Sequence, residues 1–369
     1  EAAASAGGQI TPPIMGAAAF VMIEFLEIPL TTLLLAAAVP AFMHFLGVFV
    51  QVHFEAKRLG LRGMDPDELP RLGPTLAHGW PTVIPLVILV WTIVAGYTPY
   101  LAAFYGITAC IVIGFLNPRN RLTLTDLWFG FETGARYALA VGAAAAAVGI
   151  VVGVITLTGA GFRVGFIVTQ AAARTAESFA PLIALVWVAM GAGIPPTALY
   201  SVIAAIAAPA VTQLGVPPLA AHLFILYFGI LADLTPPVCV SAYAAAGIAG
   251  ANPFRTGLTA FRLGLGKAIV PFVFAYAPVM LIVLPGFRFG EFAMVALSCA
   301  AGVSALGIAM TGYLFAPLSL LARMPLIAAS LLMISPALNA TLIGLGLVTP
   351  VVLANWFAAR RQAVQALSG

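Results

Sequence analysis

Long apolar segments, separated by short polar ones, follow one another along almost the whole chain. Runs of about 20 apolar residues fit helices that span a membrane, and the alternation of about 10-residue segments that marks a membrane barrel is absent from the sequence. The pattern predicts spanning segments near residues 29–55, 80–96, 99–116, 138–158, 268–286 and 291–310, and over 325–357, which can hold two pieces. We therefore expect an all-α polytopic membrane protein.

Three further apolar segments are interrupted by glycine and proline. Proline removes an amide donor and blocks the preceding helical turn, and glycine lets the backbone bend. The interruptions lie at 7–13 within residues 1–26, at 191–197 within 164–214, and at 233–237 within 217–250. We expect unwound helices at the first and last of these, and a re-entrant hairpin over 164–214.

Two of the interruptions carry the same motif. Thr-Pro-Pro at 11–13 recurs at 235–237, and a proline follows each threonine by 18 residues, Pro29 and Pro253. Paired breaks at matching positions of two halves indicate a transporter binding site between the repeats. We expect a transporter built from two repeats, although the motif alone leaves the relative orientation of the halves open.

The repeat also suggests how the chain is organised. The match continues from Val39–Pro40 to Val270–Pro271, where the second spacing is seven residues longer. We expect one membrane domain with four parts: 1–56, the end of the first transport repeat; 57–137, a cytoplasmic loop, two scaffold spans and an amphipathic connector; 138–286, the second transport repeat; and 287–369, C-terminal helices.

Composition agrees with a lipid-embedded protein. The chain is 62% hydrophobic and 8% charged, whereas a soluble domain is about a quarter charged. The net charge of +4 does not indicate nucleic-acid binding, because the 16 Lys and Arg residues lie mostly in short connections between apolar runs. These features exclude a soluble enzyme and make the lipid bilayer the main surroundings of the protein.

The basic residues also predict orientation. The segments 57–79, 117–137 and 251–267 carry 4, 3 and 3 Lys or Arg, whereas the connections on the other side, 97–98, 159–175, 215–216 and 287–290, carry 0, 2, 0 and 1. Basic loops stay in the cytoplasm, so we expect the first set there. Residues 117–137, and a helix over 253–267 with Arg255, Arg262 and Lys267, are expected along the membrane interface.

The breaks offer chemistry that a transporter needs. A double proline frees carbonyl oxygens, which suit a hard cation such as Na⁺ when a threonine hydroxyl lies beside them. Half-helix N-termini offer amides to an anionic substrate. The predicted ion and substrate site comprises Gly8, Gln9, Thr11, Pro12, Gly191, Gly193, Thr197, Asp233, Thr235 and Pro236, with Thr11 and Thr235 as Na⁺ ligands. The alternative is that these residues only kink packed helices.

Two other polar residues lie deep in apolar segments. Asp233 precedes the second Thr-Pro-Pro motif, and an intramembrane carboxylate is either functional or a cap for amides freed at the break. His222 is expected to form a hydrogen bond between helices rather than to ligate a metal.

The interrupted segments resemble a known family. Residues 7–16 (GGQITPPIMG), 191–198 (GAGIPPTA) and 222–247, which include Ala-Asp before Thr-Pro-Pro, are similar to the large membrane subunit of TRAP (tripartite ATP-independent periplasmic) transporters, and most like the fused permease of the TAXI subtype. The resemblance covers about residues 1–285. It implies an inverted-repeat, elevator-type symporter of the inner membrane, with residues 191–197 as the tip of its outer hairpin. Such a symporter takes a small organic acid from a periplasmic solute-binding protein and uses a Na⁺ gradient.

The sequence departs from that family at its start. The family has an inner hairpin and several helices before GGQ, and fused forms add a small-subunit region. We therefore expect a partner membrane region that completes the site, and we expect that residues 1–369 alone do not transport.

Other functions compete with this one. No HExxH or GxSxG motif and no paired intramembrane Asp or His is present in the sequence, so we expect no enzyme. Another ion-coupled symporter family with unwound helices, or a non-transporting membrane scaffold, remains the alternative. Na⁺-dependent thermal stability would separate a transporter from a scaffold.

Overall fold

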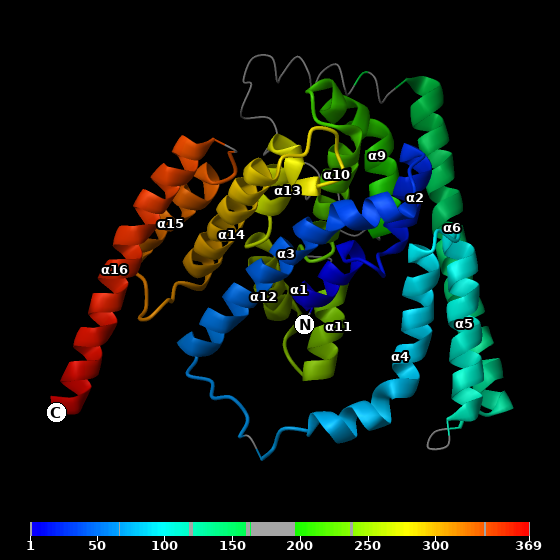
Figure 1. The fold of residues 1–369 in the computed structure, drawn as a ribbon, viewed down its shortest axis with the longest axis horizontal. Coiled ribbons are helices and arrows are strands. Elements are labelled where there is room, and N and C mark those ends of the chain that lie inside the picture. The colour runs from blue at the N-terminus through cyan, green and yellow to red at the C-terminus, as the bar shows by residue number, and fades with distance from the viewer. Residues whose placement is uncertain are drawn as a thin grey trace. The chain divides into compact units, whose positions relative to one another are not determined.

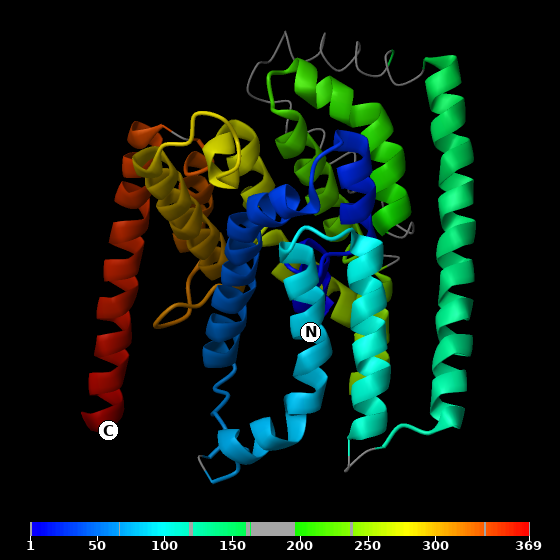
Figure 2. The same ribbon diagram turned by 45° about the vertical axis from the view of Figure 1, so that its right-hand side comes forward.

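The computed structural model describes residues 2–65, 67–117, 121–159, 163, 196–236, 239–335 and 337–368. The chain divides into two compact units. The core unit comprises Glu1–Ile28, Thr32–Leu61 and Val151–Gly369, and the hairpin unit comprises Pro29–Thr31 and Arg62–Ile150. Figures 1 and 2 show that the described elements are helices joined by short connections.

Five helices among the described residues are long and apolar enough to cross a membrane. They are Leu30–Arg58, Pro99–Leu116, Phe289–Thr311, Leu338–Gln362 and Pro253–Tyr276, the last of which contains a turn at residues 266–268. Many large apolar side chains on them are exposed, as expected where lipid replaces water as the solvent. The protein is therefore an all-α polytopic membrane protein, as the apolar pattern predicted.

The core unit begins with a broken helix. Its first elements are α1 (Ala2–Ser5), η1 (Ala6–Ile10), α2 (Ala17–Leu26) and α3 (Leu30–Arg58). Residues 11–16 between η1 and α2 are irregular, and the Gly16 amide donates to the Gln9 carbonyl at 2.9 Å across this gap. The sequence thus correctly predicted an interruption within residues 1–26.

The second broken helix lies further along the same unit. The elements here are α9 (Pro196–Gln213), α10 (Pro218–Ala232), α11 (Val240–Ala249), α12 (Pro253–Leu265), α13 (Ile269–Tyr276) and η2 (Pro278–Leu281). α10 ends at Ala232 and α11 begins at Val240, which agrees with the interruption that the sequence predicted at 233–237. The axis of α9 bends by 54° between Ala205 and Ala207, because Pro209 has no amide for the Ala205 carbonyl.

Three C-terminal helices complete the core unit. These are α14 (Phe289–Thr311), α15 (Leu320–Leu332) and α16 (Leu338–Ser368), and they pack side by side in Figure 1. A buried cluster of Ile308, Leu314, Leu318 and Leu326 joins α14 to α15, and Val50 of α3 packs against it. The predicted segment 325–357 is thus two helices.

The hairpin unit consists of α4 (Leu72–Val94), α5 (Pro99–Leu116) and most of α6 (Leu124–Thr158). α4 packs on α5, which is visible in Figure 2. The first turn of α6 is closed by a reciprocal cap: the Asp126 amide donates to the Thr123 hydroxyl oxygen at 3.2 Å, and the Thr123 amide donates to the Asp126 carboxylate at 2.9 Å.

Several predicted boundaries differ from the structure. The expected loop over 57–79 ends sooner, because α4 starts at Leu72 with Pro74 in its first turn, where proline is tolerated. The amphipathic connector 117–137 and the span 138–158 form one helix from Leu124, since nothing between them removes a backbone hydrogen bond. The expected span 268–286 is shorter, because Pro278 ends it and η2 follows.

Candidate ion and substrate site at the two helix breaks

Thr11 closes the first half-helix with two hydrogen bonds. Its amide donates to the Gly8 carbonyl at 3.3 Å, and its hydroxyl donates to the Gly7 carbonyl at 2.6 Å. The hydroxyl therefore satisfies a carbonyl that the interrupted helix leaves without its usual amide donor. The same oxygen keeps lone pairs that can face a cation.

Thr235 repeats this arrangement at the second break. Its amide donates to the Ala232 carbonyl at 2.9 Å, and its hydroxyl donates to the Leu231 carbonyl at 2.9 Å. The residue before each threonine is fully buried, Ile10 at 1% exposure and Leu234 at 0%. The sequence repeat is thus a structural repeat of the helix end.

The core unit brings the two breaks together. α10 packs against η1 and α2, and α1 packs against α11 and α12. Figure 1 shows α1 and α11 close to one another. Residues from both motifs, which lie more than 200 positions apart in sequence, consequently belong to one region of the core unit.

The position two residues before each threonine differs between the breaks. It holds Gln9 in the first and Asp233 in the second. The Ser241 hydroxyl donates to the Asp233 carboxylate, which links the end of α10 to the start of α11. A carboxylate therefore lies at the second break, held by a side chain across the gap.

The remaining predicted residues fall in different places. Gly8 has open space where a side chain would begin, and Gln9 and Pro12 are partly buried.

Thr197 lies in the first turn of α9, which packs on α2 and α10, and its carbonyl accepts from the Ser201 hydroxyl at 2.9 Å. Gly191 and Gly193 lie outside the described residues.

Pro236 is partly buried directly after the Thr235 helix end. Within the described residues no group of three or more His, Cys, Asp or Glu side chains could hold a metal ion. A cation at the breaks would depend on carbonyl, hydroxyl and carboxylate oxygens, and these are the ligands that hard cations prefer.

His222 has the role that the sequence predicted. The Tyr200 hydroxyl lies 2.7 Å from the His222 Nδ1, which joins α9 to α10. Phe25 of α2 lies against both rings. The histidine is a hydrogen-bonded contact between helices.

Lys267 was misplaced by the sequence prediction. It was expected on an interfacial helix with Arg255 and Arg262, but its side chain is buried at 4% exposure in the turn between α12 and α13. Its Nζ lies 2.9 Å from the His44 Nε2 and donates to the Ala3 carbonyl at 3.2 Å. The sequence signal near this turn was the spacing from Pro253 to Pro271, which is seven residues longer than the spacing from Pro29 to Pro40.

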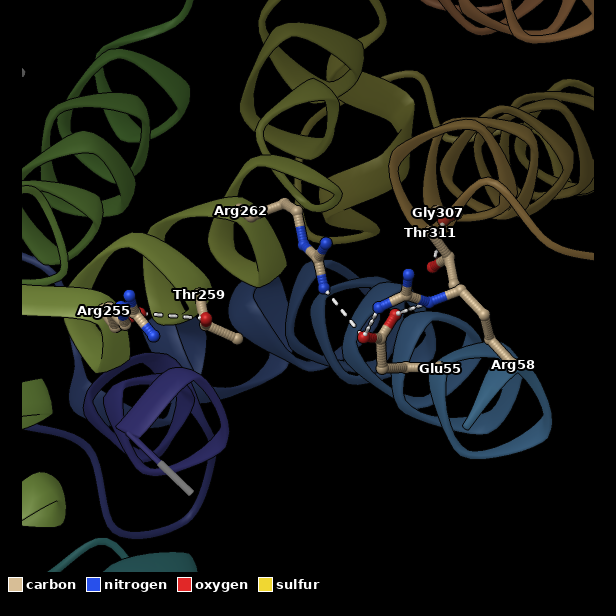
Figure 3. A network of polar contacts seen from close by, with 7 residues as sticks. All are labelled: Glu55, Arg58, Arg255, Thr259, Arg262, Gly307 and Thr311. Atoms are coloured by element: carbon tan, nitrogen blue, oxygen red, sulfur yellow. Dashed lines mark hydrogen bonds and ion pairs between the residues drawn. The ribbon is translucent and has the colours of Figure 1, made fainter. Parts of the chain in front are cut away.

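An ion-pair network links α3 to α12 away from the breaks. Figure 3 shows Glu55 of α3 between Arg58 and Arg262, with the Arg262 Nη2 3.2 Å from the Glu55 Oε1. Arg58 and Arg262 are both about two-fifths exposed or less, so solvent screens the pairs. The network joins the C-terminal end of α3 to α12.

A helical membrane protein with two equivalent helix breaks packed together has the architecture of a secondary transporter. The sequence matches the family described as "Tripartite ATP-independent periplasmic transporter, DctM component" over residues 1–287, and the chain belongs to this family. None of the curated proteins matches it. The family resemblance is confirmed, and the TAXI subtype stays a prediction.

Proposed function

We propose that the protein takes up a small organic acid across the bacterial inner membrane by Na⁺ symport. A periplasmic solute-binding protein would deliver the acid, and a small-subunit membrane region would complete the transporter. The observation that carries the proposal is the pairing of two Thr-Pro-Pro helix ends in the core unit of a TRAP-family chain. Such paired breaks in ion-coupled transporters form their binding sites.

The oxygens at the two breaks suit a hard cation. Thr11 and Thr235 each donate their hydroxyl hydrogen to a carbonyl, so their oxygens point lone pairs elsewhere. The Asp233 carboxylate adds negative charge beside Thr235. We assign Na⁺ to these oxygens, because a hard cation needs no nitrogen or sulfur ligand.

The substrate acid would use the half-helix N-termini. α2 begins after Gly16 and α11 begins after Cys239, and each start presents backbone amides that carry a partial positive charge. With Thr197 in the first turn of α9, these helix starts would hold the carboxylate of the substrate. The core unit would then move as the elevator of the transporter.

The test is uptake by the complete transporter in proteoliposomes. Radiolabelled organic acids are supplied with the cognate binding protein, under an inward Na⁺ gradient or an equal K⁺ gradient. We expect accumulation only with Na⁺ and with the binding protein. Equal uptake in K⁺, or uptake that ignores the binding protein, would overturn the proposal.

A further inference from the structure

The turn that carries Lys267 is the main difference between two equivalent helices. α3 follows Pro29 and runs without interruption to Arg58, whereas the segment after Pro253 is broken at Gly266–Ala268 into α12 and α13. The spacing from Pro253 to Pro271, which contains this turn, is seven residues longer than the spacing from Pro29 to Pro40. The second repeat therefore has a buried turn for which α3 has no counterpart.

One face of α3 supplies polar groups to that turn. Gln51 is fully buried, and its Nε2 donates to the Leu263 carbonyl, which the break exposes, at 2.8 Å. Two turns earlier on the same face, the His44 Nε2 lies 2.9 Å from the Lys267 Nζ. A side chain at Gly266 would overlap Gln51, so glycine is needed for this close approach.

Lys267 forms no ion pair among the described residues. Its two partners are the His44 imidazole and the Ala3 carbonyl of α1. Of the other titratable groups around it, Tyr227 faces the pair from α10 and Cys299 of α14 lies next to Tyr227. Glu55, the acid further along α3, is engaged by its own arginines.

Burying an ammonium group without a carboxylate is costly in free energy. The contact between the Lys267 Nζ and the His44 Nε2 accommodates one proton on either nitrogen, because each can donate to the other. The His44 Nδ1 and the Tyr227 hydroxyl have no hydrogen-bond partner within the described residues. These two groups can respond to a change of charge on the pair.

The space beside the pair is too small for an organic ligand. The cavity lined by His44, Tyr227 and Lys267 measures about 10 Å³, which corresponds to roughly one water molecule. Carboxylic acids cannot enter it, and a metal ion would meet an amine and an imidazole rather than several oxygens. The ligand that fits this site is a proton.

We propose that Lys267 and His44 form a proton-binding site within the core unit, where one proton binds and is released during transport. The proton moves between the two nitrogens and bulk water, and no other bond changes. The Ala3 carbonyl connects the site to α1, which leads into the first break, so loss of the proton changes the bond that holds α1 to the turn. The transport part of this proposal rests on the proposed function.

The first test observes the site itself. Lys57 and Lys267 are the only lysines of the sequence. Solid-state ¹⁵N NMR of [ζ-¹⁵N]lysine-labelled complete transporter in lipid is recorded from about pH 5 to about pH 9.5, which spans the ordinary imidazole range. We expect one signal, absent from the Lys267→Arg variant, to change from ammonium to amine in this range. A Lys267 signal that keeps one form throughout would overturn the proposal.

The second test observes transport. Uptake is measured against pH at a fixed Na⁺ gradient, and we expect it to change by up to about tenfold per pH unit where proton occupancy is limiting. Lys267→Arg and His44→Gln should flatten this profile. Lys57→Arg and His53→Gln, at exposed positions of α3, should leave it unchanged. Identical pH profiles for the wild-type protein and all four variants would overturn the proposal.

The two tests separate the two proposals. A titrating Lys267 signal without uptake of any organic acid would contradict the proposed function and leave the proton site in place. Na⁺-driven uptake with a Lys267 signal that does not titrate would support the proposed function and remove the proton site.

Discussion

The two helix breaks share the same threonine hydrogen bonds and carry different side chains. In both, a threonine amide donates to the carbonyl three residues earlier, and its hydroxyl donates to the carbonyl four residues earlier. Yet Gln9 stands before the first motif, and Asp233 stands before the second. The motif therefore determines how the helix ends, and the neighbouring residue determines what charge the end carries.

The helices that follow the breaks differ in a similar way. α3 is continuous, and α12 and α13 are separated by the turn that holds Lys267. Asp233 lies at the second break. The buried Lys267, further along the chain, donates to the Ala3 carbonyl of α1, which precedes the first break. The regions around the two breaks thus supply different chemistry, and substitutions at matched positions can measure the difference.

The largest effect is expected from Asp233→Asn, which makes the second break neutral like the first. Loss of a charged oxygen from a cation site should raise the Na⁺ concentration for half-maximal uptake by about 10- to 100-fold, equivalent to about 1.5–3 kcal/mol. Na⁺ titration of uptake by the complete transporter measures this. Gln9→Asn is the matched control at the first break, and an equal effect there would remove the distinction between the breaks.

Gly7→Ala should destabilise the first break. A methyl group at Gly7 would lie 2.5 Å from the His44 Nε2 and 3.0 Å from the Phe45 Cζ, whereas one at Gly8 would meet nothing within 4 Å. Such overpacking costs about 1–3 kcal/mol. Thermal unfolding in detergent should show a clear loss for Gly7→Ala and little change for Gly8→Ala. Equal unfolding temperatures would show that His44 does not pack against Gly7.

Thr235→Ala should weaken Na⁺ dependence more than folding. The substitution leaves the Leu231 carbonyl without the Thr235 hydroxyl, which costs about 1 kcal/mol of stability. It also removes one oxygen from the proposed cation site. Na⁺ activation of uptake and thermal unfolding are compared with those of Thr11→Ala, the equivalent change at the first break. Unchanged Na⁺ activation at normal expression would exclude Thr235 as a ligand.

Much of the architecture could be predicted from the sequence. The length of the apolar segments identified the spans Leu30–Arg58, Pro99–Leu116 and Phe289–Thr311. It did not identify Pro253–Tyr276, which was expected as an interfacial helix followed by a separate span. Proline located both described breaks, because a missing amide donor acts locally. The continuous α6 was not predicted, since a change from amphipathic to apolar composition alters the environment of a helix without breaking its hydrogen bonds. For the same reason α4 begins at Leu72, earlier than the predicted end of the loop at residue 79.

The site was only partly accessible to sequence reasoning. The repeat identified Thr11 and Thr235, whose hydroxyl bonds are local. The Lys267 environment depends on His44 and Ala3, which lie 223 and 264 positions away. A lysine in a basic segment resembles a solvated one until the packing of α1, α3 and α12 is known.

The smallest effect is expected from Arg262→Gln, which breaks the link between equivalent helices α3 and α12 outside the breaks. Glu55 keeps Arg58 as a partner, and all three side chains have solvent access, so the loss of unfolding free energy should be about 0.2–1 kcal/mol. The effect should shrink as salt is raised, because exposed charges are screened.

Arg255→Gln, on the same helix but outside this ion pair, is the control for removing a basic residue from α12. Thermal unfolding at low and high salt distinguishes the two variants. A salt-independent loss above about 2 kcal/mol for Arg262→Gln would mean that the two repeats are held together by this network and that the paired breaks alone do not join them.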